Sequence, residues 1–183
     1  MRRWLWVSVL AVLPFQAVAQ EDGVARVLAG LPEAQLKRLR ADPDRFAAGA
    51  MALIFGYGKG GALRREEAEQ ADAIDRAERR ARALAPFVQS DLDNDGAVAR
   101  AEAEARAAVQ GADARARLLA GFAAADGDAD GVVSGAEMRA VAEAAATLRA
   151  GQGAERYMAF DLDGDGRLTV EEVQALRAAL SAG

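Results

Sequence analysis

Three short segments of the chain carry aspartates at alternate positions and end on a glutamate. In each segment aspartate occupies positions 1, 3 and 5, glycine position 6 and glutamate position 12. The segments span residues 91–102, 126–137 and 161–172, so successive segments begin 35 residues apart. Alternate side chains of such a loop point to the same side, and the aspartates therefore converge on one point. Converging carboxylates favour binding of a hard divalent cation through oxygen ligands.

The spacing also specifies how each loop would surround its ion. Calcium accepts six to eight oxygens at roughly 2.3–2.6 Å, and a twelve-residue loop can supply them from positions 1, 3, 5, 7, 9 and 12. Glycine at position 6 permits the sharp turn, position 7 binds through its backbone carbonyl, and the final glutamate can give two oxygens. The predicted ligands are Asp91, Asp93, Asp95, Ala97 and Glu102; Asp126, Asp128, Asp130, Val132, Ser134 and Glu137; and Asp161, Asp163, Asp165, Arg167, Thr169 and Glu172.

Three Ca²⁺ ions per chain follow from this pattern. Magnesium is the alternative ion, but it demands tight octahedral geometry and retains its waters, which favours calcium where both are present outside the cytosol. Position 9 is Ala99, Ser134 and Thr169 in turn. Because alanine offers no side-chain oxygen there, the loop at 91–102 is predicted to be the weakest site.

A fourth segment is in register with the other three. It lies 35 residues before the first acidic loop, at residues 56–67, and keeps the glycine of position 6 (Gly61), the aliphatic residue of position 8 (Leu63) and the final Glu67. Glycines replace the three aspartates. We interpret it as a repeat that has kept its shape and lost its ion, the alternative being a glycine-rich loop that aligns by chance.

The loop pattern resembles the EF-hand, the helix–loop–helix calcium motif of calmodulin and parvalbumin, over roughly residues 43–183. The resemblance implies an all-α fold of four EF-hand repeats in two pairs, the first with the second and the third with the fourth, with the first loop degenerate. It also implies an aromatic residue four positions before each acidic loop, as at Phe87, Phe122 and Tyr157. A short β-bridge between paired loops is implied at position 8, occupied by Leu63, Val98, Val133 and Leu168.

The domain organisation predicted on this basis has four parts. Residues 1–19 form a signal peptide, 20–42 a short helical segment, 43–110 one EF-hand pair and 111–183 the other, with a hinge at 111–113 and Asp113 as a helix N-cap. Asp42 and Pro43 mark a helix start. Between the first two loops, residues 64–82 read as a charged helix face with acid-before-base pairs four residues apart, and Pro86 is expected to end or kink that helix.

The N-terminus has the features of a secretory signal. Arg2 and Arg3 precede an apolar run, and the small residues Ala17 and Ala19 supply a cleavage pattern. The alternative is an uncleaved anchor, although the run is shorter than the ~20 residues that span a bilayer. We therefore expect an exported protein, periplasmic or secreted, with no stable membrane insertion after cleavage. Cleavage would remove two arginines and no acid, changing the net charge from −5 to −7.

Composition excludes several kinds of chemistry. The chain has no cysteine and no histidine, which rules out disulfides, the usual zinc sites and Cys- or His-based nucleophiles. Its acidic balance argues against nucleic acid as a partner, because phosphate binding needs a basic surface. We expect no enzyme activity; the alternative is a hydrolase with a carboxylate pair outside the loops and calcium as a structural ion only.

Two calcium-dependent roles remain open at this point. The protein could be a responsive interaction module that engages a protein partner, or an ion-stabilised scaffold or buffer. Sensors open a methionine-rich groove for a target helix, whereas alanine dominates the apolar positions here. Met51, Met138 and Met158 are therefore predicted to fill cores and not to form a recognition surface.

Overall fold

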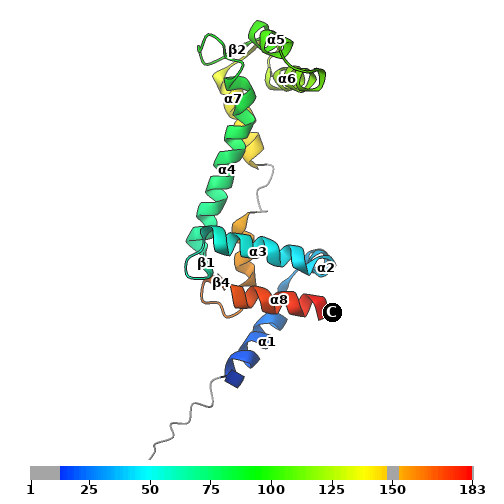
Figure 1. Cartoon of the computed structure of the whole chain (residues 1–183), viewed down its shortest axis with the longest axis vertical. Helices are drawn as coiled ribbons and strands as arrows, with labels where there is room; N and C mark the ends of the chain where they lie inside the picture. Colours follow the sequence, from blue (N-terminus) through cyan, green and yellow to red (C-terminus); the bar gives the residue numbers. More distant parts are fainter. Residues whose placement is uncertain (1–12, 148–152, 183) are drawn as a thin grey trace, which may run out of the picture. The chain divides into compact units, whose positions relative to one another are not determined.

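The computed structural model describes residues 13–147 and 153–182 of the chain. Its helices are α1 Leu13–Gly30, α2 Glu33–Ala41, α3 Pro43–Tyr57, α4 Arg65–Val88, α5 Arg100–Ala108, α6 Ala112–Ala125, α7 Gly135–Thr147 and α8 Val170–Ala182, with a 3-10 helix η1 at Ala154–Phe160. Its strands are β1 Ala62–Arg64, β2 Val98–Ala99, β3 Val132–Val133 and β4 Arg167–Thr169 (Figure 1). Helices make up most of the described chain, which confirms the predicted all-α class.

The chain divides into two compact units. One, here called the terminal unit, comprises the residues up to Ala71 together with those from Gly153 onward; the other, the central unit, runs from Asp72 to residue 152. Residues 1–12 of the predicted signal peptide lie outside the described residues, so that peptide stays a prediction. Within the described ranges, no helix combines the length and the apolar character needed to cross a membrane.

Pairing of the loops differs from the expectation. β1 pairs with β4, which sets Leu63 opposite Leu168, and β2 pairs with β3, which sets Val98 opposite Val133. The predicted pairing of first with second and third with fourth loop is therefore wrong, and the ranges 43–110 and 111–183 are not the structural units. The physical reason is α4, an unbroken helix of 24 residues, which leaves no turn between the first two loops at which the chain could fold back on itself.

The predicted hinge also has a different role. Residues 109–111 form the short connection between α5 and α6, which pack against each other inside the central unit. Gly111 is the N-cap of α6, and Asp113 lies within the first turn of that helix, so the prediction of Asp113 as N-cap is wrong. Two antiparallel helices joined by so few residues hold the loops at their far ends close together, which favours the pairing of the two middle loops.

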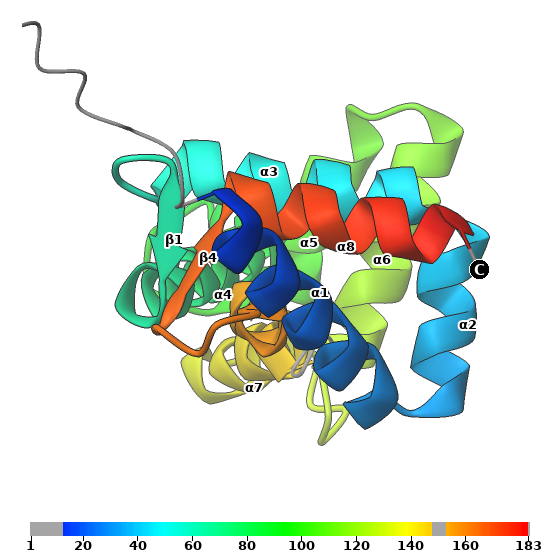
Figure 2. The ribbon, with the colours of Figure 1, turned by 90° about the horizontal axis from the view of Figure 1, so that it is seen from below.

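The terminal unit has the larger core. α3 begins where the sequence predicts, with the Asp42 side chain accepting a hydrogen bond from the Arg45 amide at 2.9 Å and proline at N1. α3 packs against α8, α1 lies against α8, and α2 contacts both α3 and α8 (Figure 2). The core residues of largest volume are aromatic or aliphatic: Phe46, Ile54, Leu63, Tyr157, Met158, Phe160, Leu162, Leu168, Leu176 and Leu180.

The central unit has a smaller core. Its buried members are Phe87, Val98, Ala103, Phe122, Ala125 and Val133, with Leu118, Met138 and Val141 packed against them. The aromatic residues expected four positions before each acidic loop are thus all buried, in this core or in that of the terminal unit. The three methionines contact cores as predicted, Met51 and Met158 in the terminal unit and Met138 in the central one.

The charged residues of α4 form ion pairs between side chains four residues apart. Arg82 bonds to Glu78 at 3.1 Å, and Arg79 bonds to Asp75; both pairs are four residues apart. Pro86 lies in the last turn of α4 and the helix ends two residues later at Val88, so this proline marks the end of the helix and does not interrupt it.

Candidate metal centres

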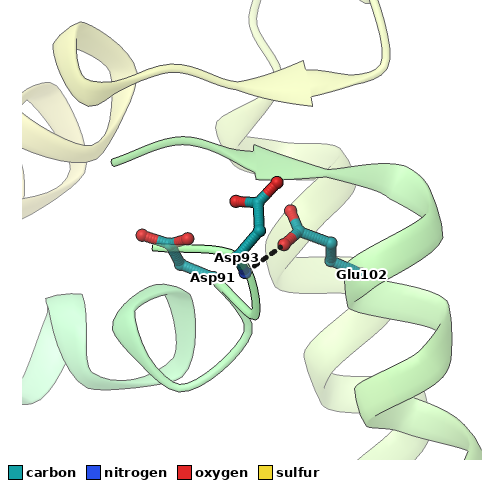
Figure 3. A group of neighbouring side chains, drawn as sticks. All are labelled: Asp91, Asp93 and Glu102. Atoms are coloured by element: carbon teal, nitrogen blue, oxygen red, sulfur yellow. Dashed lines mark hydrogen bonds between the residues drawn. The ribbon is translucent and has the colours of Figure 1, made fainter. Parts of the chain in front are cut away.

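Three acidic groups in the described chain are close enough to share one ion each. Each group joins the aspartates of positions 1 and 3 with the glutamate of position 12, and one carboxylate oxygen from each member lies within 4.8 Å of the others. The groups are Asp91, Asp93 and Glu102; Asp126, Asp128 and Glu137; and Asp161, Asp163 and Glu172. In Figure 3, Asp91 and Asp93 come from the loop, and Glu102 comes from the first turn of α5.

Backbone amides shape each loop around its aspartates. In the loop at 161–172, the Gly166 amide donates to Asp161 at 2.8 Å, and the Asp165 amide donates to Asp163 at 3.0 Å. The same bonds recur in the other two acidic loops at 3.1 to 3.2 Å. Each position-1 and position-3 carboxylate thereby faces the inside of its loop, where an ion would lie.

The position-5 aspartates are placed differently from the other predicted ligands. Asp95, Asp130 and Asp165 each accept a hydrogen bond from the amide of position 7, at 2.8, 2.7 and 2.9 Å. These donors are Ala97, Val132 and Arg167, the residues predicted to bind through their carbonyls. The position-5 side chains are exposed and do not belong to the three acidic groups. Their predicted contribution to ion binding stays a prediction.

The position-12 glutamates close each loop from the following helix. One oxygen accepts from the amide of position 2, Leu92, Gly127 or Leu162, at 2.7 to 2.8 Å. The other accepts from the amide of position 9, Ala99, Ser134 or Thr169, at 2.8 Å. A single carboxylate therefore caps the helix and ties both ends of the loop together.

These amides also keep two of the glutamates ionised. Hydrogen bonds from the Ala99 and Leu92 amides hold the pKa of Glu102 below its ordinary value. Bonds from the Ser134 amide, the Gly127 amide and the Ser134 hydroxyl do the same for the pKa of Glu137. A hydrogen-bonded donor favours the charged form, so both side chains are anionic and able to ligate a cation.

Two backbone positions in each acidic loop are left-handed. Gly96, Gly131 and Gly166 at position 6 have φ of 86°, 85° and 82°, as the predicted sharp turn requires. Position 4 was not recognised from the sequence as a second such position, yet Asn94, Ala129 and Gly164 have φ of 62°, 59° and 77°. Asparagine and glycine there were the available signal, because both tolerate this conformation. Ala129 is the strained exception.

The first loop keeps only half of the acidic-loop geometry. Its β1 strand pairs as in the other loops, and Glu67 accepts a hydrogen bond from the Arg64 amide at 3.0 Å, the same helix cap. The first half differs, because α3 continues to Tyr57, and Gly60 and Gly61 form a tight hairpin turn with positive φ at both residues. The prediction that this segment kept its shape is thus right for residues 62–67 and wrong for residues 56–61.

Position 9 distinguishes the acidic loops as the sequence suggested. The Ser134 and Thr169 hydroxyls donate to the position-12 glutamates at 2.9 and 2.8 Å and accept from the glutamate amides at 3.3 Å. Ala99 provides the backbone half of this arrangement only. Glu102 therefore lacks the hydroxyl bond of the other two glutamates, and its third bond comes from the Asp93 amide at 3.3 Å.

Two arginine side chains lie beside the acidic groups, and neither contact was expected, because Arg167 was predicted as a ligand through its carbonyl only. The Arg100 guanidinium lies 4.0 Å from Asp126, with the arginine from the second loop and the aspartate from the third, and it also covers the Phe122 ring at 5.4 Å. Arg167 lies 3.4 Å from Asp165. The signal for Arg100 was absent from the sequence, because its partner belongs to a different repeat.

An ion fits the donor set of these loops. The acidic groups offer carboxylate oxygens alone, the ligands that calcium prefers. The Oδ1 atom of Asp126 is buried and has no hydrogen-bond partner in the described protein. A buried carboxylate oxygen without a donor is costly, and a cation in the loop would satisfy it.

Comparison with protein families gives a match at two of the three acidic loops. A family model described as EF hand matches residues 119–142 and 158–176. The chain carries EF-hands. Comparisons with curated proteins and with solved structures gave no match.

The EF-hand assignment confirms the resemblance seen in the sequence. The two matched ranges contain the loops at 126–137 and 161–172 with parts of their flanking helices. The loop at 91–102 repeats the same bonds and the same acidic group outside the matched ranges. Family and geometry together indicate calcium binding.

Proposed function

We propose that the protein binds three calcium ions, one in each of the loops at 91–102, 126–137 and 161–172. The single observation that carries this proposal is the acidic group repeated in all three loops and closed by a glutamate from the following helix. Aspartates of positions 1, 3 and 5, the carbonyl of position 7 and the glutamate would hold each ion. Bound calcium supplies six positive charges to twelve predicted ligand carboxylates, which relieves their mutual repulsion.

Ion counting tests the stoichiometry directly. Titration calorimetry on the purified chain should give three calcium ions. The first loop is excluded from the count because it has glycine at positions 1, 3 and 5. A fourth ion would contradict this assignment, and fewer than three would remove one acidic loop from the proposal.

We further propose that the protein works outside the cytosol, after removal of residues 1–19. The support is the sequence of those residues and the nature of the ion, since calcium outside the cytosol fills even sites with dissociation constants of 10⁻⁴ to 10⁻³ M. Even sites of such low affinity would be filled there. N-terminal sequencing of the protein recovered from cell fractions tests both points, and an intact Met1 in the cytosolic fraction would contradict them.

Within this framework the central unit is our candidate for the interaction module. It contains an open cavity of about 650 Å³ with Phe87 and Phe122 in its lining and alanines around them. Among the described residues that line it, the charged ones are Arg82 and Arg117. We propose as its occupant an amphipathic helix of a partner protein, with small apolar side chains facing the aromatic floor and acidic residues facing the arginines.

An apolar dye tests whether this cavity responds to calcium. Dye fluorescence should rise when calcium is added, and Leu118→Gln, which places an amide in the cavity wall, should reduce that rise. Leu36→Gln is the matched control because Leu36 packs against the other core. Equal fluorescence with calcium and with chelator would instead favour the buffer or scaffold role. We propose no catalytic role for the protein.

A further inference from the structure

Helix α1 packs on the terminal unit with a regular apolar stripe. Val24, Val27 and Leu28 of α1, with Leu31 just after its end, follow the i, i+3, i+4, i+7 spacing, and all four are partly buried against the core of that unit. This stripe brings α1 to the acidic loop at 161–172.

The contact between α1 and that loop centres on one residue, Leu162. The Arg26 guanidinium donates a hydrogen bond to the Leu162 carbonyl at 2.6 Å. One turn earlier, Gly23 lies so close that an added Cβ would be 2.7 Å from the same carbonyl oxygen and 3.0 Å from the Leu162 Cβ. No side chain larger than glycine fits at residue 23 without moving the loop or the helix.

Leu162 stands between two predicted calcium ligands and is bonded to a third. Asp161 precedes it and Asp163 follows it, and its amide donates to the position-12 carboxylate of Glu172 at 2.7 Å. Both backbone polar groups of Leu162 are thus held, the carbonyl by α1 and the amide by the loop's own glutamate. The backbone between Asp161 and Asp163 is therefore held both by α1 and by a glutamate of the same loop.

The corresponding residue of the second loop has no such cover. Leu92 also occupies position 2 and donates its amide to Glu102, but its side chain is 60% exposed, whereas Leu162 is 2% exposed. The same residue type in the same loop position is thus buried in one unit and solvated in the other. The loop at 91–102 thus forms its internal bonds without a covering helix, so α1 is an additional support of the loop at 161–172.

We propose that α1 is a clamp on the loop at 161–172, and that docking of α1 and calcium binding in this loop strengthen each other. The proposal rests on the proposed calcium function and names Gly23 and Arg26 as positioning residues for it. A docked α1 holds residues 161–163 in their bound path before the ion arrives, which lowers the ordering cost of binding. Coupling between two sites is reciprocal, so calcium must hold α1 in place by the same factor.

Coulomb repulsion alone would make Arg26 lower the calcium affinity, whereas the clamp makes Arg26 raise it. A guanidinium near a calcium loop repels the incoming cation, so its removal would tighten binding if only Coulomb repulsion mattered. The clamp predicts weaker binding when the hydrogen bond is lost. Gly23→Ala separates the two explanations because it changes no charge and adds only a methyl group.

The test isolates one loop in the full chain. With Glu102→Gln and Glu137→Gln as background, the loop at 161–172 becomes the principal calcium site, and its affinity is followed by calorimetry and by tyrosine fluorescence. Gly23→Ala should weaken binding by at least about fivefold, the lower end of typical coupling between sites. Gly30→Ala is the matched control: the same substitution in the same helix, with no atom within 4 Å of the new Cβ. It should leave the affinity unchanged.

Variants of Arg26 and amide hydrogen exchange of α1 give two further tests of the clamp. Arg26→Met keeps the apolar stem and removes the hydrogen bond, and it should also weaken binding, whereas Arg26→Lys should restore part of the affinity. In the unsubstituted chain, calcium should slow amide hydrogen exchange of Val27 and Leu28 by the same factor of about five or more.

Each outcome decides between the two proposals. Equal affinities for Gly23→Ala and Gly30→Ala, with α1 exchange unaffected by calcium, would overturn the clamp and leave calcium binding intact. A loss of affinity of the same size in both glycine variants would also overturn it, because a general change in helix stability would then suffice. Absence of calcium binding in the background chain would overturn the calcium function of this loop and the clamp together.

Discussion

The terminal and central units share the same pairing of two loops but differ in what covers their apolar surface. In each, two position-8 residues are fully buried at an antiparallel bridge, Leu63 with Leu168 and Val98 with Val133. The terminal unit then buries its apolar surface under α1 and α2, from the same chain. The central unit leaves an open cavity floored by aromatic side chains. The bridge between two paired loops thus fixes the loops in both units, while what covers the apolar side decides whether a unit is closed or has an open cavity.

The unit with more acidic loops has the smaller core. The terminal unit has one acidic loop and the larger core, whereas the central unit has two acidic loops and the smaller core. A small core stabilises a domain less, because stabilisation follows the apolar area buried. We therefore expect the central unit to depend on its ions and the terminal unit to depend on its packing.

Calcium removal should have the largest effect, and it should be unequal. At 100 times its dissociation constant each ion adds about 2.7 kcal/mol, so the central unit loses about twice as much as the terminal unit. Hydrogen exchange of the chain in EGTA should show protection lost in α5, α6 and α7 and retained in α3 and α8. The calcium-saturated chain is the reference. Equal loss in both units would show that core size does not set their dependence on ions.

The corrected loop pairing predicts which buried residues are energetically coupled. Leu63→Ala and Leu168→Ala should each destabilise the protein by about 2–5 kcal/mol, because both side chains are fully buried. Denaturant unfolding of the double variant should reveal a coupling of about 0.5–3 kcal/mol between them. Leu63→Ala combined with Val98→Ala is the control and should be additive within about 0.5 kcal/mol. Coupling in the control pair alone would restore the pairing of the first loop with the second.

Loss of one ligand charge should weaken a single site. Glu137→Gln keeps the shape of the side chain and removes the anion from the loop at 126–137, where charge-assisted contacts are each worth about 1.5–3 kcal/mol. The affinity of this loop should fall on the order of tenfold or more, measured by calorimetry. Glu143→Gln removes the same charge from an exposed position on α7 and should have little effect. An equal loss in both variants would mean that net charge, and not ligation, sets the affinity.

The ligand sets could be predicted because they are local in sequence. Twelve consecutive residues contain the aspartates, the turn glycine and the closing glutamate, and the structure brings Asp161, Asp163 and Glu172 together as that spacing suggested. Helix starts such as that at Asp42 are local for the same reason. Position 4 was missed although it is local, because Ala129 gives no sign of a left-handed backbone.

The pairing of loops could not be obtained in the same way. The expected pairing came from the resemblance, and no local pattern in residues 65–88 contradicts it. Pro86, expected to end or kink this helix, falls in its last turn, where its missing amide and its ring disturb little of the helix. The contact of Arg26 with Leu162 joins residues 136 positions apart, and no pattern near either residue announces it.

The contact between Arg100 and Asp126 provides the smallest and most specific test of the central unit. The arginine lies 4.0 Å from a predicted ligand and is 60% exposed, so solvent screens most of its effect. It competes with calcium for Asp126, and Arg100→Gln should therefore raise the affinity of the loop at 126–137 by about two- to threefold, within the range of exposed ion pairs. Arg139→Gln, an equal loss of charge on α7, is the control. Because screening grows with ionic strength, the gain should shrink in calorimetry at 1 M salt. A gain that persists there would trace the effect to the Phe122 contact of Arg100 and not to its charge.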